Sequence, residues 1–208
     1  MFKLSTVNGT PVLELASRLD LSLYLGNKCE ISSFEFDGII KISNGTVSVR
    51  GLFAGCTHLN CPIVLPYGLN SCENMLSGCI DYNYPIILPP TVLNCAEMLR
   101  GCTMYNQPVI LPEGVLNCKR MLKYCTRFNQ PVVVPASVNT DIGVFEMFDH
   151  CSSMNMPIIF HGHISDVAAV KAIGGLYEIK PENVYLADGL LSDIYNPNDK
   201  RLESGFHV

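Results

Sequence analysis

The chain has 208 residues, of which 48% are hydrophobic and only 16% are charged, and its formal net charge is -5. This length fits one domain with terminal additions and excludes a large multidomain enzyme. An average soluble domain has roughly 25% charged residues, so this composition is apolar and is not that of a disordered chain. Because the net charge is negative, no overall basic field favours phosphate binding, and we expect no nucleic-acid partner.

The sequence also predicts no membrane insertion. No run reaches the roughly 18 apolar residues that a spanning helix needs, and the uncharged stretch 82–96 contains three prolines. The first twenty residues are polar where a signal peptide has its apolar core, so we expect a chain that is not exported. Without that signal, the sequons at Asn8 and Asn44 are interpreted as Asn-Gly turns.

Residues 1–50 contain short runs in which apolar and polar residues alternate. The runs 12–15 and 34–42 have the period of half-buried strands, and Asn44-Gly45 follows as a turn. We therefore predict a β-rich N-terminal cap over residues 1–50.

From residue 51 the sequence repeats itself every 23 residues. A fifth copy follows after 26 residues, which places three inserted residues near 139–143. Several series kept in one register predict stacked units that share a core. The repeated positions are Asn60, Asn83, Asn106, Asn129 and Asn155, each followed two residues later by proline; Cys56, Cys79, Cys102, Cys125 and Cys151; and Leu52, Met75, Met98, Met121 and Met147.

Each period contains a pattern typical of a short helix and one typical of a short strand. In 118–125, Cys, Met, Leu and Cys occupy positions i, i+3, i+4 and i+7, which is one helix face, and Asn117 precedes them as an N-cap would. Asn94 and Ser71 hold the same place in earlier copies. The β-branched run 109–111 lies between two prolines and predicts a strand. The predicted fold class is therefore an α/β solenoid of about five such turns over residues 51–164.

The repeat Cys-x-x-Met-Leu-x-x-Cys, Asn-x-Pro and a strand ending in Leu-Pro resembles the leucine-rich repeats of the BspA type. It is similar as well to the repeats of mycoplasma-type surface lipoproteins, which Asn106-Gln107 and Asn129-Gln130 match best. The resemblance covers 52–160, although Met-Leu replaces the usual Ala-Phe pair and the first proline leads directly into the strand. It implies a solenoid used for binding or adhesion, with no catalytic residue and no cofactor.

Residues 165–208 are predicted to close the other end. Ser165 and Gly174 bracket an apolar pattern typical of a capping helix, and 177–191 has the character of one or two strands. The tail from residue 177 has six acidic and three basic residues, so it could be an arm that binds a partner.

Ten cysteines raise the question of disulfides or metal. Eight fall on the Cys56 series and on a shorter series, Cys72, Cys95 and Cys118, and all eight lie on the apolar face of the repeat. We interpret them as buried free thiols, with disulfides and metal ligation as the alternatives. The clusters Cys56/His58/Cys61 and His150/Cys151/His161/His163 lack the paired spacing of a structural zinc site, so we predict no metal. The sequence also lacks the common hydrolase, metalloprotease and phosphate-binding motifs, and we expect no enzyme.

Two surfaces are predicted to bind a partner. Strand alternation turns one β-branched residue of each repeat outward, and the residue between asparagine and proline varies beside this column. The opposite alternation, or a terminal segment that covers the column, would remove the first surface. The apolar stripe is Val64, Ile87, Ile110, Val133 and Ile159, and the variable column beside it includes Tyr84, Gln107 and Gln130.

The second surface is a basic cluster, which belongs to a stretch of five bases and one acid between 100 and 135. It is either a solvated face or a receptor for the acidic tail of another copy, a contact that would build a ring or filament. Its members are Lys119, Arg120, Lys123 and Arg127.

These observations favour a non-enzymatic protein–protein interaction module. We interpret the chain as a structural component of a larger assembly, such as a phage or virus particle, that binds a protein partner or itself. The alternative is an adhesin that recognises a host-surface ligand through the same face. The absence of a signal peptide favours a cytoplasmic or virion-assembled chain over a secreted one.

Overall fold

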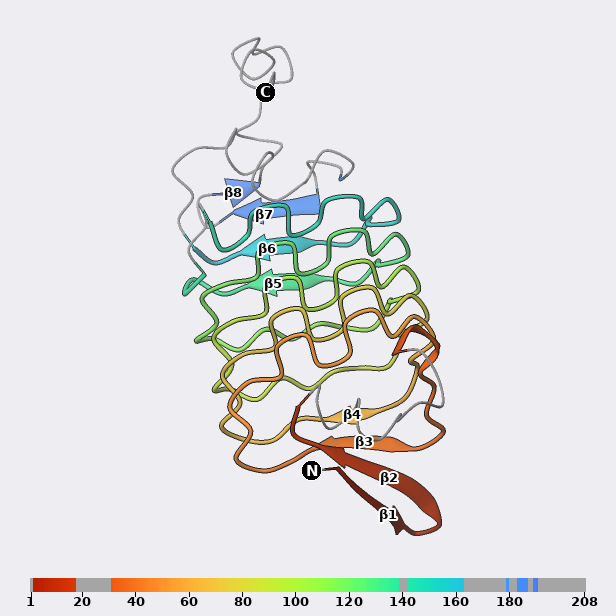
Figure 1. Ribbon diagram of the computed structural model, residues 1–208. Coiled ribbons are helices and arrows are strands. Elements are labelled where there is room, and N and C mark those ends of the chain that lie inside the picture. Colours follow the sequence, from red (N-terminus) through yellow and green to blue (C-terminus); the bar gives the residue numbers. More distant parts are fainter. Residues whose placement is uncertain are drawn as a thin grey trace.

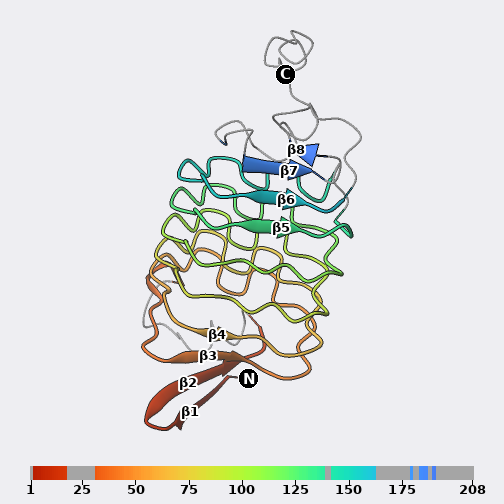
Figure 2. The same ribbon diagram turned by 180° about the vertical axis from the view of Figure 1, so that it is seen from behind.

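The structure is a computed structural model that describes residues 2–17, 31–138, 142–162, 179, 183–186 and 189–190. Successive 23-residue coils of the repeat region lie one on another, and strands occupy the two ends of the stack (Figures 1 and 2). The described strands form two separate four-stranded sheets, ordered β1-β2-β3-β4 and β5-β6-β7-β8. The strands are β1 (Lys3–Val7), β2 (Thr10–Leu15), β3 (Ile39–Ile42), β4 (Ile63–Val64), β5 (Val132–Val134), β6 (Ile158–Phe160), β7 (Val184–Leu186) and β8 (Gly189–Leu190).

Both sheets are parallel inside and antiparallel at their outer pair. In the first sheet β1 pairs antiparallel with β2, and β2, β3 and β4 are parallel. In the second, β5, β6 and β7 are parallel and β8 pairs antiparallel with β7. Parallel pairing follows from the repeat, because each coil brings the chain back to the same side in the same direction.

The predicted α/β solenoid is wrong. Among the described residues the one helical segment is a short 3-10 turn, η1 (Ile31–Ser33), and the stretches predicted as helices are successive turns. The strands make two small sheets, and no single sheet runs along all the repeats.

The hydrogen bonds of residues 95–102 explain why no helix forms. The N–H groups of Glu97 and Leu99 leave the coil and donate to carbonyls of Lys119 and Met121 in the next coil. The N–H of Met98 instead donates to the carbonyl of Cys95, three residues earlier, and closes a turn. An α-helix would keep all these bonds within one segment.

Left-handed backbone conformation at two positions of each coil imposes this alternation. A residue with positive φ cannot continue a right-handed helix, yet successive turns still direct the Cys, Met, Leu and Cys side chains inward. A helix-like sequence period therefore arises without a helix. The left-handed residues are Gly51, Asn74, Glu97, Arg120 and Glu146 at the first position, and Gly55, Gly78, Gly101, Tyr124 and His150 at the second.

The residues predicted as N-caps have the side-chain contact of a cap without the helix. The Oδ1 atoms of Asn94 and Asn117 accept hydrogen bonds from the N–H groups two residues later, both at 3.0 Å. Ser71 makes the same contact at 3.4 Å. Such side chains favour turns as readily as helix starts.

The strand predicted at 109–111 is also absent. Strand pairing stops after β4 and resumes at β5, and within the described residues no backbone hydrogen bond involves 86–88 or 109–111. Prolines precede and follow both segments, but prolines also flank β5, which does pair, so proline alone does not account for the missing ladder. The middle of this face is extended chain without sheet hydrogen bonds.

The terminal regions meet the sequence predictions in part. Asn8 and Gly9 have φ values of 48° and 82° and form the turn between β1 and β2, and Asn44-Gly45 forms another turn, so both predicted Asn-Gly turns are confirmed. The predicted run 12–15 lies in β2, and 39–42 of the second run is β3. The predicted helix 165–174, most of the tail and the inserted residues 139–141 lie outside the described residues, and the domain boundaries remain predictions.

The core consists of stacked columns of equivalent side chains. The Leu52–Met147 series and both cysteine series are buried. The rings of Tyr82, Tyr105 and Phe128 stack with centroids 6.2 Å apart at each step. The hydroxyl groups of the two tyrosines are buried without a hydrogen-bond partner, so at these positions ring packing outweighs an unpaired polar group.

Substitution of Gly78 tests the left-handed position. Gly78 has φ 77°, and a Cβ there would contact Gly55, so Gly78→Val is expected to lower the free energy of unfolding by roughly 1–3 kcal/mol. Gly114→Val is the matched control, because Gly114 has no positive φ and open space around it. Urea unfolding measures both variants, and equal stabilities would contradict the assignment.

Candidate functional site

The apolar stripe is exposed at its centre. The exposed fractions are 50% for Val64, 86% for Ile87, 80% for Ile110 and 41% for Val133, while Ile159 is half-buried. The flanking residues 63, 86, 109, 132 and 158 are buried, so the predicted alternation is confirmed. A continuous column of exposed aliphatic side chains is uncommon on a monomer unless it forms an interface.

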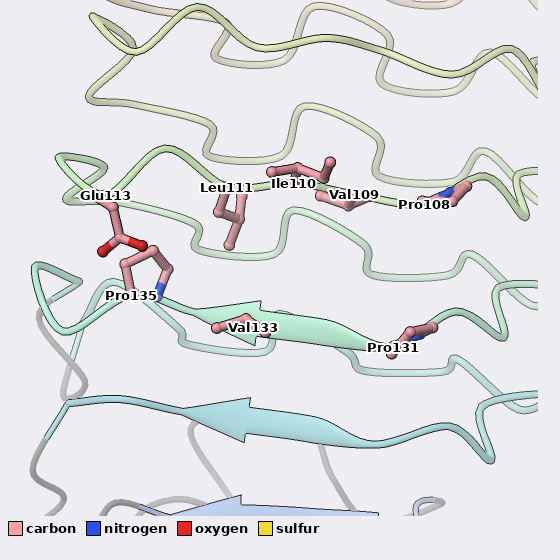
Figure 3. A pocket seen from close by; sticks show the side chains of 8 residues that line it. All are labelled: Pro108, Val109, Ile110, Leu111, Glu113, Pro131, Val133 and Pro135. Carbon is pink, nitrogen blue, oxygen red and sulfur yellow. The ribbon is translucent and has the colours of Figure 1, made fainter.

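Two shallow apolar pockets lie along this stripe, in the interval between β4 and β5. One, of about 420 Å³, lies between 108–111 and β5, where Ile110 and Val133 line its middle, Pro108 and Pro131 lie at one end and Glu113 and Pro135 at the other (Figure 3). The other, of about 410 Å³, is lined by β4 residues together with Tyr84 and Ile87. Both pockets border the segments that lack sheet hydrogen bonds.

The variable column beside the stripe divides into two kinds of residue. Tyr84 is 38% exposed and lines a pocket, so it is available to a partner. Gln107 and Gln130 are half-buried, and their amide Nε2 atoms donate to Asn83 Oδ1 and Asn106 Oδ1, each at 3.3 Å. The side-chain amides of these two glutamines therefore connect neighbouring coils, which makes the glutamines weaker candidates for recognition of a partner.

The asparagines of the Asn-x-Pro repeats form a continuous hydrogen-bond ladder along the stack. Asn106 Oδ1 accepts the backbone N–H of Asn129 at 2.8 Å, and the equivalent bonds join Asn60 to Asn83, Asn83 to Asn106, and Asn129 to Asn155. The side chain of each asparagine thus accepts the backbone N–H of the equivalent asparagine in the next coil. The sequence shows that these asparagines recur at a regular spacing, but it does not show that they form hydrogen bonds to one another.

Two of the four members of the predicted basic cluster, Arg120 and Lys123, are paired with acidic residues within the chain. Lys123 lies 2.6 Å from Glu146 Oε2 and 2.7 Å from Asp149 Oδ2, and Arg120 lies 2.7 Å from the same Glu146 oxygen. These contacts hold the pKa of Glu146 below its ordinary value, although burial opposes the shift, and they raise the pKa of Lys123. Lys119 is half-buried with its Nζ 5.4 Å from the Phe145 ring centre, and Arg127 is exposed.

The sequence does not reveal these pairings, because Glu146 and Asp149 follow the three-residue insertion and lie outside the stretch 100–135 that contains the basic residues. The structure also shows a second column of exposed aliphatic residues, which the sequence conceals because Asn70 interrupts it: Val47, Leu93, Leu116 and Ile142.

The nine cysteines in the described residues are all buried, which confirms the predicted burial. The thiols of Cys79, Cys102, Cys125 and Cys151 each donate to a carbonyl of the preceding coil, at 3.0–3.1 Å. Burial raises the pKa of Cys61, Cys72 and Cys118 to about 12. Such thiols stay protonated at neutral pH and are poor nucleophiles and poor metal ligands.

The histidine clusters do not assemble a metal site. His58 is exposed and contacts Asp81 at 2.8 Å, whereas Cys56 and Cys61 are buried. His150 contacts Asp149 at 2.9 Å and stacks on Tyr124, and His163 lies outside the described residues. Over the described ranges, no group of three or more potential ligands is placed to hold a metal ion.

Comparison of the chain with protein-family models, curated proteins and solved structures finds no significant match. None of the helical segments within the described ranges has the length and hydropathy to cross a membrane. The features that remain as a candidate site are the apolar stripe, its two pockets and Tyr84. The resemblance to BspA-type repeats remains a prediction.

Removal of one asparagine tests the ladder. Asn106→Ala is expected to lower the free energy of unfolding by about 1 kcal/mol, because the N–H of Asn129 and the amide of Gln130 both lose an acceptor. Gln107→Ala, which removes only one exposed donor, is the control and is expected to change stability by less than about 0.5 kcal/mol. An Asn106 variant as stable as the control would contradict a structural role.

The buried thiols predict alkaline destabilisation. In the unfolded chain a thiol has a pKa of about 8.5, and in the folded chain burial raises it, so this stabilisation is complete below pH 8.5 and is lost as the pH rises toward 12. Urea unfolding with reductant, from pH 7 to 10.5, is expected to show a decrease of up to about 1.4 kcal/mol per pH unit for each such thiol. A pH-independent free energy would contradict the burial.

The redox state needs a separate measurement. Thiol counting in denaturant without reductant is expected to find nearly all ten cysteines free. Four or more missing thiols would contradict the free-thiol interpretation.

Proposed function

We propose that the chain is a non-enzymatic interaction module that contributes to a larger protein assembly, such as a virion, through its apolar stripe. The observation that carries this proposal is the exposure of Ile87 and Ile110, at 86% and 80%, beside two apolar pockets. Burial of apolar area is the main favourable term in most protein association, and these side chains gain it only when a partner covers them.

The two pockets beside the stripe support the same proposal. A partner segment that rests on it can insert apolar side chains into pockets of about 410 and 420 Å³ on either side of the two isoleucines. Because Glu113 is the one charged residue that lines either pocket, we expect association to depend weakly on salt.

A double variant, Ile87→Ser with Ile110→Ser, tests the proposal. Both side chains are exposed, so folding stability should change little, whereas association through the stripe should be lost. Light scattering over a hundredfold range of concentration should show that the mass of the wild-type protein rises above that of the variant.

The matched control is Leu93→Ser with Leu116→Ser, which removes two aliphatic side chains of the same size from the second column, where their exposure is lower, at 43% and 52%. A control whose mass falls to that of the stripe variant, or a stripe variant whose mass equals that of the wild-type protein at every concentration, would contradict the proposal. An adhesin would instead be monomeric, and its attachment would depend on Tyr84.

A further inference from the structure

The outer strand of the first sheet has an edge that no described strand covers. β1 is last in the sheet order, and all five of its residues are exposed, with Leu4 and Val7 at 57%. Figure 1 shows the β1–β2 hairpin at the end of the stack, with β1 on its outer side. A tight Asn-Gly turn with two positive φ values joins it to β2. An ordered strand with an open edge is a template for pairing with another chain.

The register shows which backbone groups face outward. Thr6 lies opposite Pro11, and proline has no N–H, so this pair cannot exchange two hydrogen bonds with β2. Pair types alternate in an antiparallel ladder, so Leu4, opposite Leu13, also lies in a non-hydrogen-bonded pair. The N–H and C=O groups of Leu4 and Thr6 therefore point away from β2, toward the open edge.

The edge lacks the usual devices that prevent pairing. β1 contains no proline, its five residues pair with β2 without a bulge, and its single charge, Lys3, stands at one end. A parallel neighbour would place Lys3 beside its own copy. An antiparallel neighbour centred on Ser5 would place Lys3 opposite Val7 and Leu4 opposite Thr6, with no like charges facing each other.

We propose that β1 pairs antiparallel with β1 of a second copy of this chain, with the two-fold axis at Ser5. The Leu4 and Thr6 groups of each copy would then form four backbone hydrogen bonds, and the two first sheets would become one sheet of eight strands. Such a two-fold contact is self-complementary and closes after two copies. This surface is separate from the apolar stripe, so the proposal goes beyond the proposed function.

The full chain with the stripe substitutions Ile87→Ser and Ile110→Ser is the suitable background, because association through the stripe is removed there. Light scattering should give the mass of two chains, and adding Thr6→Pro should reduce it to one. Thr6→Pro removes the backbone N–H of residue 6, which points toward the open edge, and it leaves the hydrogen-bonded pairs with β2 in place. Thr6→Val keeps the N–H and should retain the mass of two chains.

Cross-linking gives a second, independent readout. Ser5 residues on the axis would form a non-hydrogen-bonded pair with Cα atoms about 4.5 Å apart, within the range of a disulfide. Ser5→Cys in the same background should therefore give a disulfide-linked dimer under mild oxidation. Lys3→Cys is the control, because its two copies would lie about 13 Å apart, four residues along the strands.

Three results would overturn the pairing: a mass of one chain in the stripe background, a mass of two chains that Thr6→Pro leaves unchanged, or equal cross-linking of both cysteine variants. None of them bears on the apolar stripe. Conversely, a wild-type mass that equals that of the stripe variant at every concentration would contradict association through the stripe and leave the β1 pairing standing.

Discussion

The fold depends on backbone hydrogen bonds that leave one coil and end on the next. In residues 95–102 alternate N–H groups donate to the following coil, and the N–H groups between them close turns within their own coil. A single coil therefore cannot satisfy its buried backbone, which is a strong requirement in any folded protein. Stability comes from stacking, as in other repeat architectures in which each unit contacts only its neighbours.

This constraint explains the residues that repeat. The carbonyls of Phe53 and Leu76 each accept the backbone N–H three residues later, and the Cys79-type thiol of the following coil gives each of them a second, weak donor within the core. The backbone N–H of the asparagine in each Asn-x-Pro segment needs an acceptor, and the side-chain Oδ1 of the asparagine in the preceding coil supplies it. Hydrogen bonding between coils therefore accounts for the recurrence of asparagine and of the Cys79-type cysteines in the sequence.

The sequence predicts the repeat unit, the buried columns and the outward β-branched residues, because these depend on spacing alone. It fails on the helices, because turns built around left-handed residues place Cys95, Met98 and Leu99 inward with the spacing of a helix face. A signal was present: Gly55, Gly78 and Gly101 recur at 23 residues within the expected helices, where glycine disfavours a helix. The pairing of Arg120 and Lys123 could not be predicted, because their acidic partners come from the coil after the insertion.

The same backbone requirement links the two proposed surfaces. Where coils are well paired, as in residues 95–102, the backbone has no capacity left for a partner. The backbone is unpaired at the edge of β1 and in 86–88 and 109–111, and exposed apolar side chains such as Leu4, Ile87 and Ile110 occur there, although others lie where the backbone is paired. At β1 the open groups lie along a strand edge, so a second strand can satisfy them. At the stripe they lie within a face between neighbouring coils, so a partner gains mainly by covering apolar side chains. The two contacts should therefore differ in kind: the first depends on backbone donors and tolerates side-chain changes such as Thr6→Val, whereas the second depends on the side chains themselves.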